Sequence, residues 1–396
     1  MKKIKRLVAV VLLAGCIFSV GVIWGKVKAQ EELEKKLEVY LQVLTLVKNS
    51  FVDKNVDNTK MVYGSIKGLL ESLGDPYTRF MEPKAYKEMR IRLRGSYSGI
   101  GIYIGMKDTQ LTVIAPIPGT PADKAGLKSK DKIMTIDDKN TKDMSLDEAV
   151  SIIRGPQGTN VKLGIHRGRE KETREISIKR DKISIKSTEY KMLPDQIAYI
   201  KFNTFEKQDA PQEFSKALTQ ANKENAAGLI LDLRGNGGGL LDNAIQIGSM
   251  FIRQGAIVQT VDREGAREVK YSTGQILWWK PLVVLINEAS ASASEILAGA
   301  LKDDKIAPIV GARSFGKASV QSVRVLQDDS ALLLTIAKYL TPSGEDISKK
   351  GIQPDYIVEI PTKEAEFEAY EKAGKDTQLE KAQEVIKGLI GKTQTQ

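Results

Sequence analysis

One serine in this sequence has surroundings suited to nucleophilic catalysis. Ser292 follows a short apolar run, residues 281–286, and precedes residues 295–301, whose apolar positions recur at helical spacing. We therefore expect Ser292 at the N-terminus of a helix, where unpaired N–H groups and the helix dipole can stabilise an oxyanion. The same residues also fit a capping box between Ser292 and Glu295, which needs no catalysis.

A serine nucleophile needs a base, and the chain contains a single histidine, His166. It lies in an alternating segment in which Val161, Leu163 and Ile165 are expected on the buried face of a strand. His166 should therefore point away from that face. A Ser-His-Asp site is not expected, and a lysine is the more suitable base.

Lys317 is the lysine whose neighbours favour this chemistry. A lysine becomes a usable base when burial lowers its pKa from about 10.4 toward neutrality. The residues beside Lys317 are small or apolar, and Gln321 offers a neutral amide four positions later. The alternative is a solvated surface lysine.

A glycine-rich turn supplies a third chemical element. A buried strand is expected at residues 228–233, then the turn 234–239, and then a helix from about Leu241 to Phe251. Backbone N–H groups in such a turn can bind an anion. Leu240 stands where a dinucleotide-binding fingerprint needs its last glycine. An oxyanion-binding turn is therefore favoured over a nucleotide site.

Six motifs occur together in the chain. They are Ser-Leu-Gly-Asp-Pro-Tyr-Thr (72–78), Asp-Leu-Arg-Gly-Asn-Gly-Gly-Gly (232–239), Ser-Ala-Ser-Ala-Ser-Glu (290–295), Phe-Gly-Lys-x-x-x-Gln (315–321), Tyr-Leu-Thr-Pro-Ser-Gly (339–344) and Gly-Ile-Gln-Pro-Asp (351–355). In this order and spacing the sequence resembles the carboxyl-terminal processing peptidases, which are tail-specific serine peptidases with a PDZ domain. The resemblance covers about residues 40–361.

The resemblance implies a role for each matching residue. Ser292 would be the nucleophile, Lys317 the general base, and Gln321 the residue that positions the lysine. The backbone N–H groups of Gly238 and Ala293 would form the oxyanion hole. No cofactor or metal is expected, because one histidine and one cysteine cannot assemble a zinc site from those ligands.

The middle of the chain resembles a PDZ domain. Gly99, Ile100, Gly101 and Ile102 look like the loop whose N–H groups capture a peptide C-terminus, while the peptide adds as an extra strand. A short helix ending at a glycine, a strand at 131–137 and a helix at 146–154 are expected to follow. Lys130 stands where the family usually has glycine, so a different turn type is expected there. A small β-domain without a ligand is the alternative.

Arg154, at the end of that last helix, is a candidate regulatory residue. Its side chain could lie along the surface or pair with a carboxylate across the domain boundary. The resemblance, in which the PDZ domain gates the catalytic site, favours the second. A chain end in the groove would then shift Lys317 between competent and incompetent positions.

Composition is typical of a globular protein of two to three domains, with 396 residues, 41% hydrophobic and 28% charged. The net charge of +10 could indicate nucleic-acid binding, but the first 29 residues carry six positive side chains and no acidic one. The remainder has no basic block interleaved with aromatic residues. Nucleic acid is therefore not an expected partner.

The N-terminal segment predicts a location. Residues 7–25 are uncharged and nearly all apolar, which is long enough to cross a bilayer, and a basic segment precedes them. The positive-inside rule places residues 26–396 outside the cytoplasm. We expect a single-pass anchor in the cell membrane. Cleavage near Ala29, giving a secreted form, and lipidation at Cys16 are the alternatives.

Several segments are expected to be helical outside the catalytic and PDZ domains. An apolar stripe at helical spacing is formed by Leu33, Leu37, Leu41, Leu44 and Val47, and further helices are expected at residues 59–72 and within 364–390. These segments either pack on the chain's own core or form a homodimer contact.

The expected fold class is α/β: a mixed-sheet serine peptidase core with an inserted PDZ domain, an N-terminal membrane anchor and helical N- and C-terminal segments. The expected domains are an anchor at 1–29, an N-terminal helical region at 30–90, the PDZ domain at 91–181, the peptidase core at 182–361 and a helical tail at 362–396. Residues 180–184 are the expected hinge between the PDZ domain and the core.

The sequence thus predicts a serine endopeptidase that recognises the free C-termini of proteins or peptides through its PDZ domain. It would cleave extracytoplasmic proteins through a Ser-Lys acyl-enzyme. The first alternative is a catalytically silent PDZ adaptor of the cell envelope, which would have no chemical reason to keep Ser292, Lys317 and Gln321 together. The second is a nucleotide-dependent enzyme that uses the turn at residues 236–239.

Overall fold

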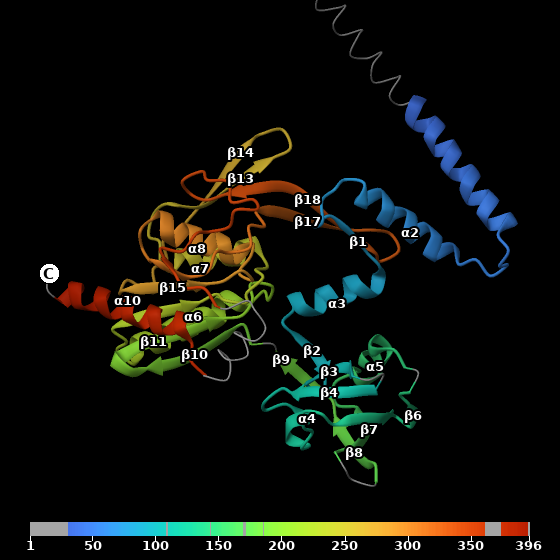
Figure 1. The fold of residues 1–396 in the computed structure, drawn as a ribbon, viewed down its shortest axis with the longest axis horizontal. Helices are drawn as coiled ribbons and strands as arrows, with labels where there is room; N and C mark the ends of the chain where they lie inside the picture. The colour runs from blue at the N-terminus through green and yellow to red at the C-terminus, as the bar shows by residue number, and fades with distance from the viewer. Residues whose placement is uncertain are drawn as a thin grey trace, which may run out of the picture. The chain divides into compact units, whose positions relative to one another are not determined.

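The computed structural model describes residues 31–107, 110–142, 144–168, 172–184, 186–360 and 374–394. The chain divides after Ser72 into two compact parts. The first holds a helix over residues 31–50 and helix α2 (Asn58–Glu71), so both predicted helices are confirmed (Figure 1). Helix α2 begins after Asp57, whose carboxylate accepts N–H groups of its first turn.

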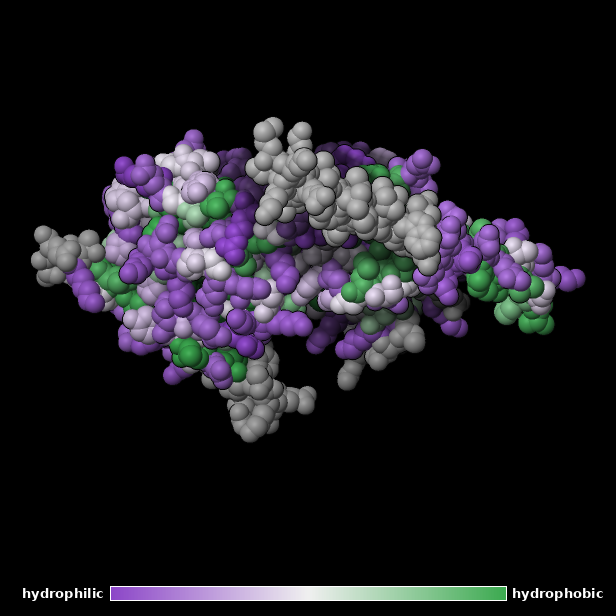
Figure 2. Space-filling view, turned by 90° about the horizontal axis from the view of Figure 1, so that it is seen from above, coloured by the Kyte–Doolittle hydropathy of each residue, from purple (hydrophilic) through white to green (hydrophobic). Residues whose placement is uncertain are grey.

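The predicted anchor at residues 7–25 lies outside the described residues. No helix in the described part of the chain is long and apolar enough to cross a membrane. The helix at 31–50 keeps its apolar side chains exposed; they include Leu33, Leu37, Leu41, Val43, Leu46 and Val47. On the face shown in Figure 2, apolar residues form small separate patches in a mostly hydrophilic surface.

A six-stranded sheet forms the centre of the second part. Its order is β10 (Thr188–Leu193), β11 (Ile197–Phe202), β12 (Gly228–Asp232), β15 (Leu282–Ile286), β16 (Ile309–Gly311) and β19 (Tyr356–Ile357). All neighbouring pairs are parallel except β10 with β11. Strands β12 and β15 are buried along their whole length, which explains their uninterrupted apolar sequences.

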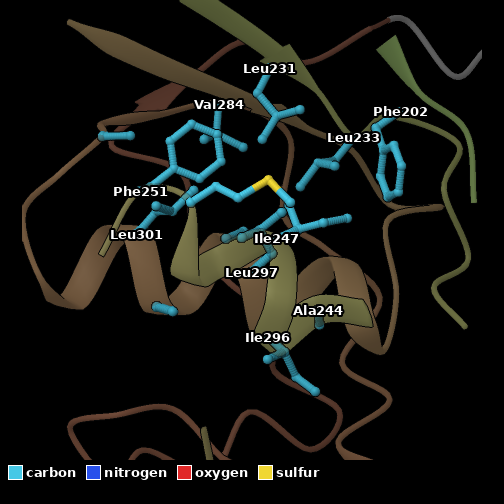
Figure 3. Close-up of a cluster of buried hydrophobic side chains, with 14 of the residues drawn as sticks. Phe202, Leu231, Leu233, Ala244, Ile247, Phe251, Val284, Ile296, Leu297 and Leu301 are labelled. Carbon is cyan, nitrogen blue, oxygen red and sulfur yellow. The ribbon is translucent and has the colours of Figure 1, made fainter. Parts of the chain in front are cut away.

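Helices cover both faces of this sheet. On one face lie α6 (Ala210–Lys223), α7 (Leu241–Ser249) and α8 (Ala293–Asp303), and on the other lies α10 (Thr377–Gln394). Figure 3 shows Leu231 and Val284 of the sheet facing Ile247 of α7 and Leu297 of α8. Each such fully buried side chain contributes about 1.5–3 kcal/mol, so this core holds the site's supporting elements in place.

A second sheet carries the segment after Lys317. It consists of β1 (Arg79–Met81), β18 (Ala331–Leu340), β13 (Ala256–Asp262) and β14 (Arg267–Tyr271) in that order, and β17 (Ser319–Val325) also pairs with β18. Strand β1 pairs antiparallel with β18 although about 250 residues separate them in sequence. The N-terminal end of this part of the chain therefore belongs to the catalytic core.

The PDZ domain forms its own sheet and core. The sheet has β3 (Ile102–Lys107), β4 (Gln110–Pro116), β5 (Lys132–Ile136), β7 (Asn160–His166) and β8 (Arg174–Lys179) in order, with β6 (Lys139–Asn140) beside β5 and the helices α4 (Pro121–Lys124) and α5 (Leu146–Ile153). Val161, Leu163 and Ile165 are buried, as predicted. Lys130 has a φ of 71°, so this lysine adopts the left-handed conformation that glycine usually takes.

Two connections join the PDZ domain to the core. Helix α3 (Pro83–Leu93) leads into β2 (Ser96–Gly99), which pairs antiparallel with β9 (Asp181–Ser184). The predicted hinge at 180–184 is therefore mostly a strand in a two-stranded ribbon.

Within the central sheet, a short 3₁₀ turn, η1 (Pro194–Gln196), joins β10 to β11.

Candidate active site

The three serines of the Ala-Ser-Ala-Ser-Ala-Ser run have different surroundings. Ser290 and Ser294 are fully buried, and their hydroxyls donate to the carbonyl oxygens of Leu233 and Asn236, each at 2.8 Å. These two bonds fasten the start of α8 to the glycine-rich turn. Ser292 is partly exposed and lines a cavity, so its hydroxyl faces space in which a substrate could lie.

Ser292 is the N-cap residue of α8, as the sequence predicts. Its backbone is in an unusual conformation, with φ 56° and ψ −117°, which costs on the order of 1–3 kcal/mol in a non-glycine residue. The N–H of Glu295 donates to the Ser292 carbonyl oxygen at 2.8 Å. The predicted capping box is present, with Oε2 of Glu295 accepting the Ser292 N–H at 2.9 Å.

Lys317 lies in the loop before β17. Its Nζ donates to Oε1 of Gln321 at 2.8 Å, and Nε2 of Gln321 donates to the Ser319 hydroxyl at 2.9 Å. A lysine ammonium only donates hydrogen bonds, so the oxygen end of the amide faces the lysine. Nζ also lies 5.0 Å from the centre of the Tyr77 ring. The structure thus holds the amine through a neutral amide and an aromatic face.

The surroundings of Lys317 lower its pKa. Burial is the main cause, because a desolvated ammonium is unfavourable, and the positive charge of Arg79 acts in the same direction. The carboxylates of Asp75, Glu295 and Glu206 oppose the shift. The net direction is the one that a lysine base requires.

Ser292, Lys317 and Gln321 line one cavity of about 260 Å³. Tyr339 and Ala293 also line it. Its apolar wall comes from several elements and includes Met89, Leu93, Leu240, Leu241, Ile296, Val323 and Leu333. The three residues, predicted from two separate motifs, are therefore brought to one place, with apolar surface beside them for a substrate side chain.

Gly238 lies directly against the turn that contains Ser292. A Cβ at this position would meet the Ala291 carbonyl oxygen at 2.6 Å and the Ala293 nitrogen at 2.8 Å, and its φ is +95°. Only glycine fits there. Its N–H, however, donates to Oδ1 of Asn236 at 2.9 Å. In this conformation the buried Asn236 side chain accepts the Gly238 N–H, and the role of this N–H in an oxyanion hole stays a prediction.

The rest of the glycine-rich turn is also held by side chains. The Gly235 N–H donates to Oδ1 of Asn287 at 2.9 Å, and Nδ2 of Asn236 donates to the Phe202 carbonyl oxygen at 2.7 Å. The backbone N–H groups of Gly235 and Gly238, which a phosphate would need, therefore already donate to side chains of the protein. This geometry disfavours the nucleotide alternative.

Arg234 fastens the same turn to the C-terminal helix. Its guanidinium bonds to Asp232, and it donates to both carboxylate oxygens of Asp376 at 2.7 and 2.8 Å. Burial alone would lower the pKa of Arg234, but hydrogen bonds to Asp376 and Asp232 raise it above its ordinary value. Helix α10 packs on the sheet through Ala382 and Ile386. This segment therefore packs on the chain's own core, one of the two alternatives left by the sequence.

Tyr77 is the residue near the lysine to which sequence reasoning gave no role. It belongs to the motif at 72–78, which marked the resemblance. The carboxylate of Asp75 accepts the Thr78 hydroxyl at 2.7 Å, and the Thr78 hydroxyl accepts the Thr335 N–H of β18 at 3.1 Å. These bonds hold the motif beside Lys317.

The predicted peptide loop lines a groove in the PDZ domain. Gly99, Ile100, Gly101 and Ile102 share this cavity of about 140 Å³ with Tyr97 and with Val150 and Ile153 of α5. Arg154 lies at the end of the groove. Its guanidinium forms an ion pair with Glu88 of α3, and its Cζ lies 4.7 Å from the centre of the Tyr97 ring. The arginine is thus paired with a carboxylate outside the PDZ sheet.

Comparison with known proteins defines the class of this chain. Peptidase family S41 matches residues 196–358, the PDZ domain matches residues 88–166, and the N-terminal domain of the activating protease CtpB matches residues 21–85. These matches define a serine peptidase with an attached PDZ domain.

Individual relatives agree. The carboxy-terminal processing protease CtpA of Bacillus subtilis is 37% identical over 349 residues, which is 87% of this chain and 74% of the relative. The carboxyl-terminal-processing protease of Synechocystis is 38% identical over 80% of this chain and 75% of its own length. The solved photosystem II D1 C-terminal processing protease is 33% identical, covering 83% of this chain and 89% of that one, with a TM-score of 0.49. The chain belongs to the carboxy-terminal processing proteases.

Proposed function

We propose that this chain is an endopeptidase that cleaves proteins through a Ser-Lys acyl-enzyme, with Ser292 as nucleophile and Lys317 as base. One observation carries the proposal: Ser292 and Lys317 line the same cavity, and burial lowers the pKa of the lysine. His166 lies in β7 of the PDZ sheet and does not line this cavity. Lysine is therefore the base that the site offers.

In the proposed reaction, neutral Lys317 takes the proton of Ser292 as its oxygen attacks the substrate carbonyl. The N–H of Ala293 lies at the start of α8, where the helix dipole favours the developing oxyanion. The Gly238 N–H could join it after leaving Asn236. Lys317 then protonates the leaving amine and activates the water that releases the acyl group.

We further propose that the PDZ groove captures substrate C-termini. In this proposal the backbone N–H groups of the loop at Gly99–Ile102, which lines the groove, bind the carboxylate while the peptide adds beside β3. The cleavage segment would then lie across the cavity in extended form. Arg154 is the candidate link to the catalytic core, because it bounds the groove and pairs with Glu88 of α3.

Placement outside the cytoplasm is also a proposal, supported by the apolar segment at residues 7–25 and the basic residues before it. A homodimer contact is proposed for the helix at 31–50, whose apolar side chains are exposed. Any contact through α10 would have to use residues other than the buried Ala382 and Ile386.

The test is incubation of the full chain with unfolded model proteins, followed by mass spectrometry of the products. Wild type should produce internal cleavages, and Ser292→Ala should produce none above background. Thermal unfolding of both proteins would check that the variant is folded. Cleavage by folded Ser292→Ala at matched purity would contradict the proposal.

A further inference from the structure

Glu295 is a buried acid at the centre of the catalytic loops. Only 1% of the residue is exposed. Its Oε1 accepts the Ser314 hydroxyl and the Gly316 N–H, each at 2.6 Å. Its Oε2 accepts the Ser292 N–H at 2.9 Å, the Lys317 N–H at 3.0 Å and the Tyr339 hydroxyl at 3.0 Å. One carboxylate therefore collects five donors.

These donors come from three separate places in the chain. Ser292 is the proposed nucleophile, the loop 314–317 contains the proposed base Lys317, and Tyr339 belongs to β18. The same oxygen of Glu295 accepts the N–H of Ser292 and the N–H of Lys317. The backbones of the two reacting residues are thus fixed relative to each other through a single atom.

A helix cap does not explain this arrangement. A capping box requires Glu295 to accept only the Ser292 N–H. The other four donors lie about 20 or more residues further along the chain, and they would not be needed to start α8. Three of the five donors are backbone N–H groups, which cannot act as acceptors. The position therefore requires a pure acceptor, which a carboxylate is and an amide is not.

We propose that Glu295 is a positioning residue that sets the geometry between Ser292 and Lys317. The proposal rests on the Ser-Lys assignment above. Glu295 lies behind the nucleophile turn and does not line the cavity, so it acts through the two residues it holds. Its loss would leave three backbone donors buried without acceptors and would loosen the strained Ser292 turn.

The charge of Glu295 gives this proposal a second signature. Burial and the positive charge of Arg79 lower the pKa of Lys317. The carboxylates of Asp75, Glu295 and Glu206 raise it. The hydroxyls of Tyr77 and Tyr339 also lie nearby. Replacing Glu295 by glutamine removes one raising charge. The pKa of Lys317 should fall further, and the alkaline rise in activity should move to lower pH.

The experiment compares kcat and KM across pH for the full chain with a fluorogenic protein substrate. Glu295→Gln should lower kcat by about tenfold or more, since it breaks charge-assisted hydrogen bonds, with little change in KM. Its pH limb should lie below that of wild type. Glu295→Asp should keep the limb near the wild-type position and still lose kcat. Glu345→Gln, an exposed acid elsewhere in the core, should match wild type.

A role confined to folding would lower only the amount of active enzyme, without moving the pH limb. Glu295→Gln with wild-type kcat and an unmoved limb would overturn the proposal. If Glu295→Gln does not fold, Glu295→Asp carries the test, and a folded Glu295→Asp with wild-type kcat would overturn the proposal equally. Cleavage by Ser292→Ala, by contrast, would overturn the proposed function itself.

Discussion

The catalytic centre and the PDZ groove are built in opposite ways. Around Ser292 the supporting polar side chains are buried: Ser290, Ser294 and Asn236 are fully buried, and Glu295 is 1% exposed. At the groove, the Arg154 and Glu88 side chains are 28% and 35% exposed and form a partly exposed ion pair. Ion pairs that solvent reaches contribute little to stability. The side chains around Ser292 thus form a buried, fixed frame, whereas the contacts at the proposed peptide groove are partly open to solvent.

The largest effect should come from the fixed frame. Lys317→Ala should lower kcat/KM on the order of 10⁴-fold or more, because the serine loses its base while the buried hydrogen bonds of the turn remain. His166→Ala is the matched control and should keep near-normal turnover. Both would be assayed for cleavage of an unfolded protein. A folded but inactive His166→Ala would restore the histidine triad to consideration.

A smaller effect on activity is expected from changes at the PDZ groove. A non-cleavable peptide with a free C-terminus and an apolar last residue should raise cleavage of a second substrate by about fivefold or more. Its amidated form should not, because the loop at Gly99–Ile102 is proposed to bind the terminal carboxylate. Arg154→Ala should uncouple peptide from activity, whereas Lys179→Ala, an exposed residue of β8, should not.

Equal rates of cleavage of the second substrate with saturating free and amidated peptide would contradict the expected activation by the PDZ domain. The PDZ domain would then tether substrates without switching the enzyme. A ligand shifts an equilibrium only by the difference in its affinity for the two states, so equal rates would mean no such difference.

The smallest effect concerns stability. Asp376→Asn should lower the free energy of unfolding by about 1–3 kcal/mol, because the largely buried Arg234 loses a charged partner. Asp195→Asn, which breaks the exposed pair between Asp195 of η1 and Lys387 of α10, should cost about 1 kcal/mol at most. Urea denaturation would measure both. Equal losses in the two variants would show that Arg234 does not depend on α10.

The same pair should respond to pH. Burial opposes ionisation of Asp376, but the Arg234 guanidinium holds the pKa of that carboxyl below its ordinary value. Its contribution is therefore present above the unfolded-state pKa and is lost as the pH falls through the lower folded-state pKa. The difference between wild type and Asp376→Asn should shrink in acid.

The sequence motifs predict which residues line the catalytic cavity, but not the hydrogen bonds that hold those residues in position. Ser292, Lys317 and Gln321 were identified because their spacing matches a known pattern, and local periodicity located α8 and the buried strand β12. The function of Glu295 was visible only as a capping box, because its four other donors come from distant loops. The bond from Gly238 to Asn236 depends on a side-chain orientation that no spacing encodes.

The tertiary contacts of the two end segments also could not be predicted from the sequence. The motif at 72–78 indicated the family, yet the approach of Tyr77 to Lys317 requires β1 to pair with β18 across the length of the core. Likewise, helical spacing predicted a helix near the C-terminus but left open whether it would pack on the core or on another chain. Burial of Ile386 against the sheet decides this for α10.

The most direct test of the Ser-Lys mechanism is to label the full chain with a serine-reactive fluorophosphonate over a range of pH and to locate the adduct by mass spectrometry. The mechanism predicts a single adduct on Ser292, formed at a rate that rises with pH on a pKa below that of an exposed lysine, because burial disfavours the charged amine. In Lys317→Ala this pH-dependent labelling should be lost. An adduct on another serine, or unchanged labelling of Ser292 in Lys317→Ala, would contradict it.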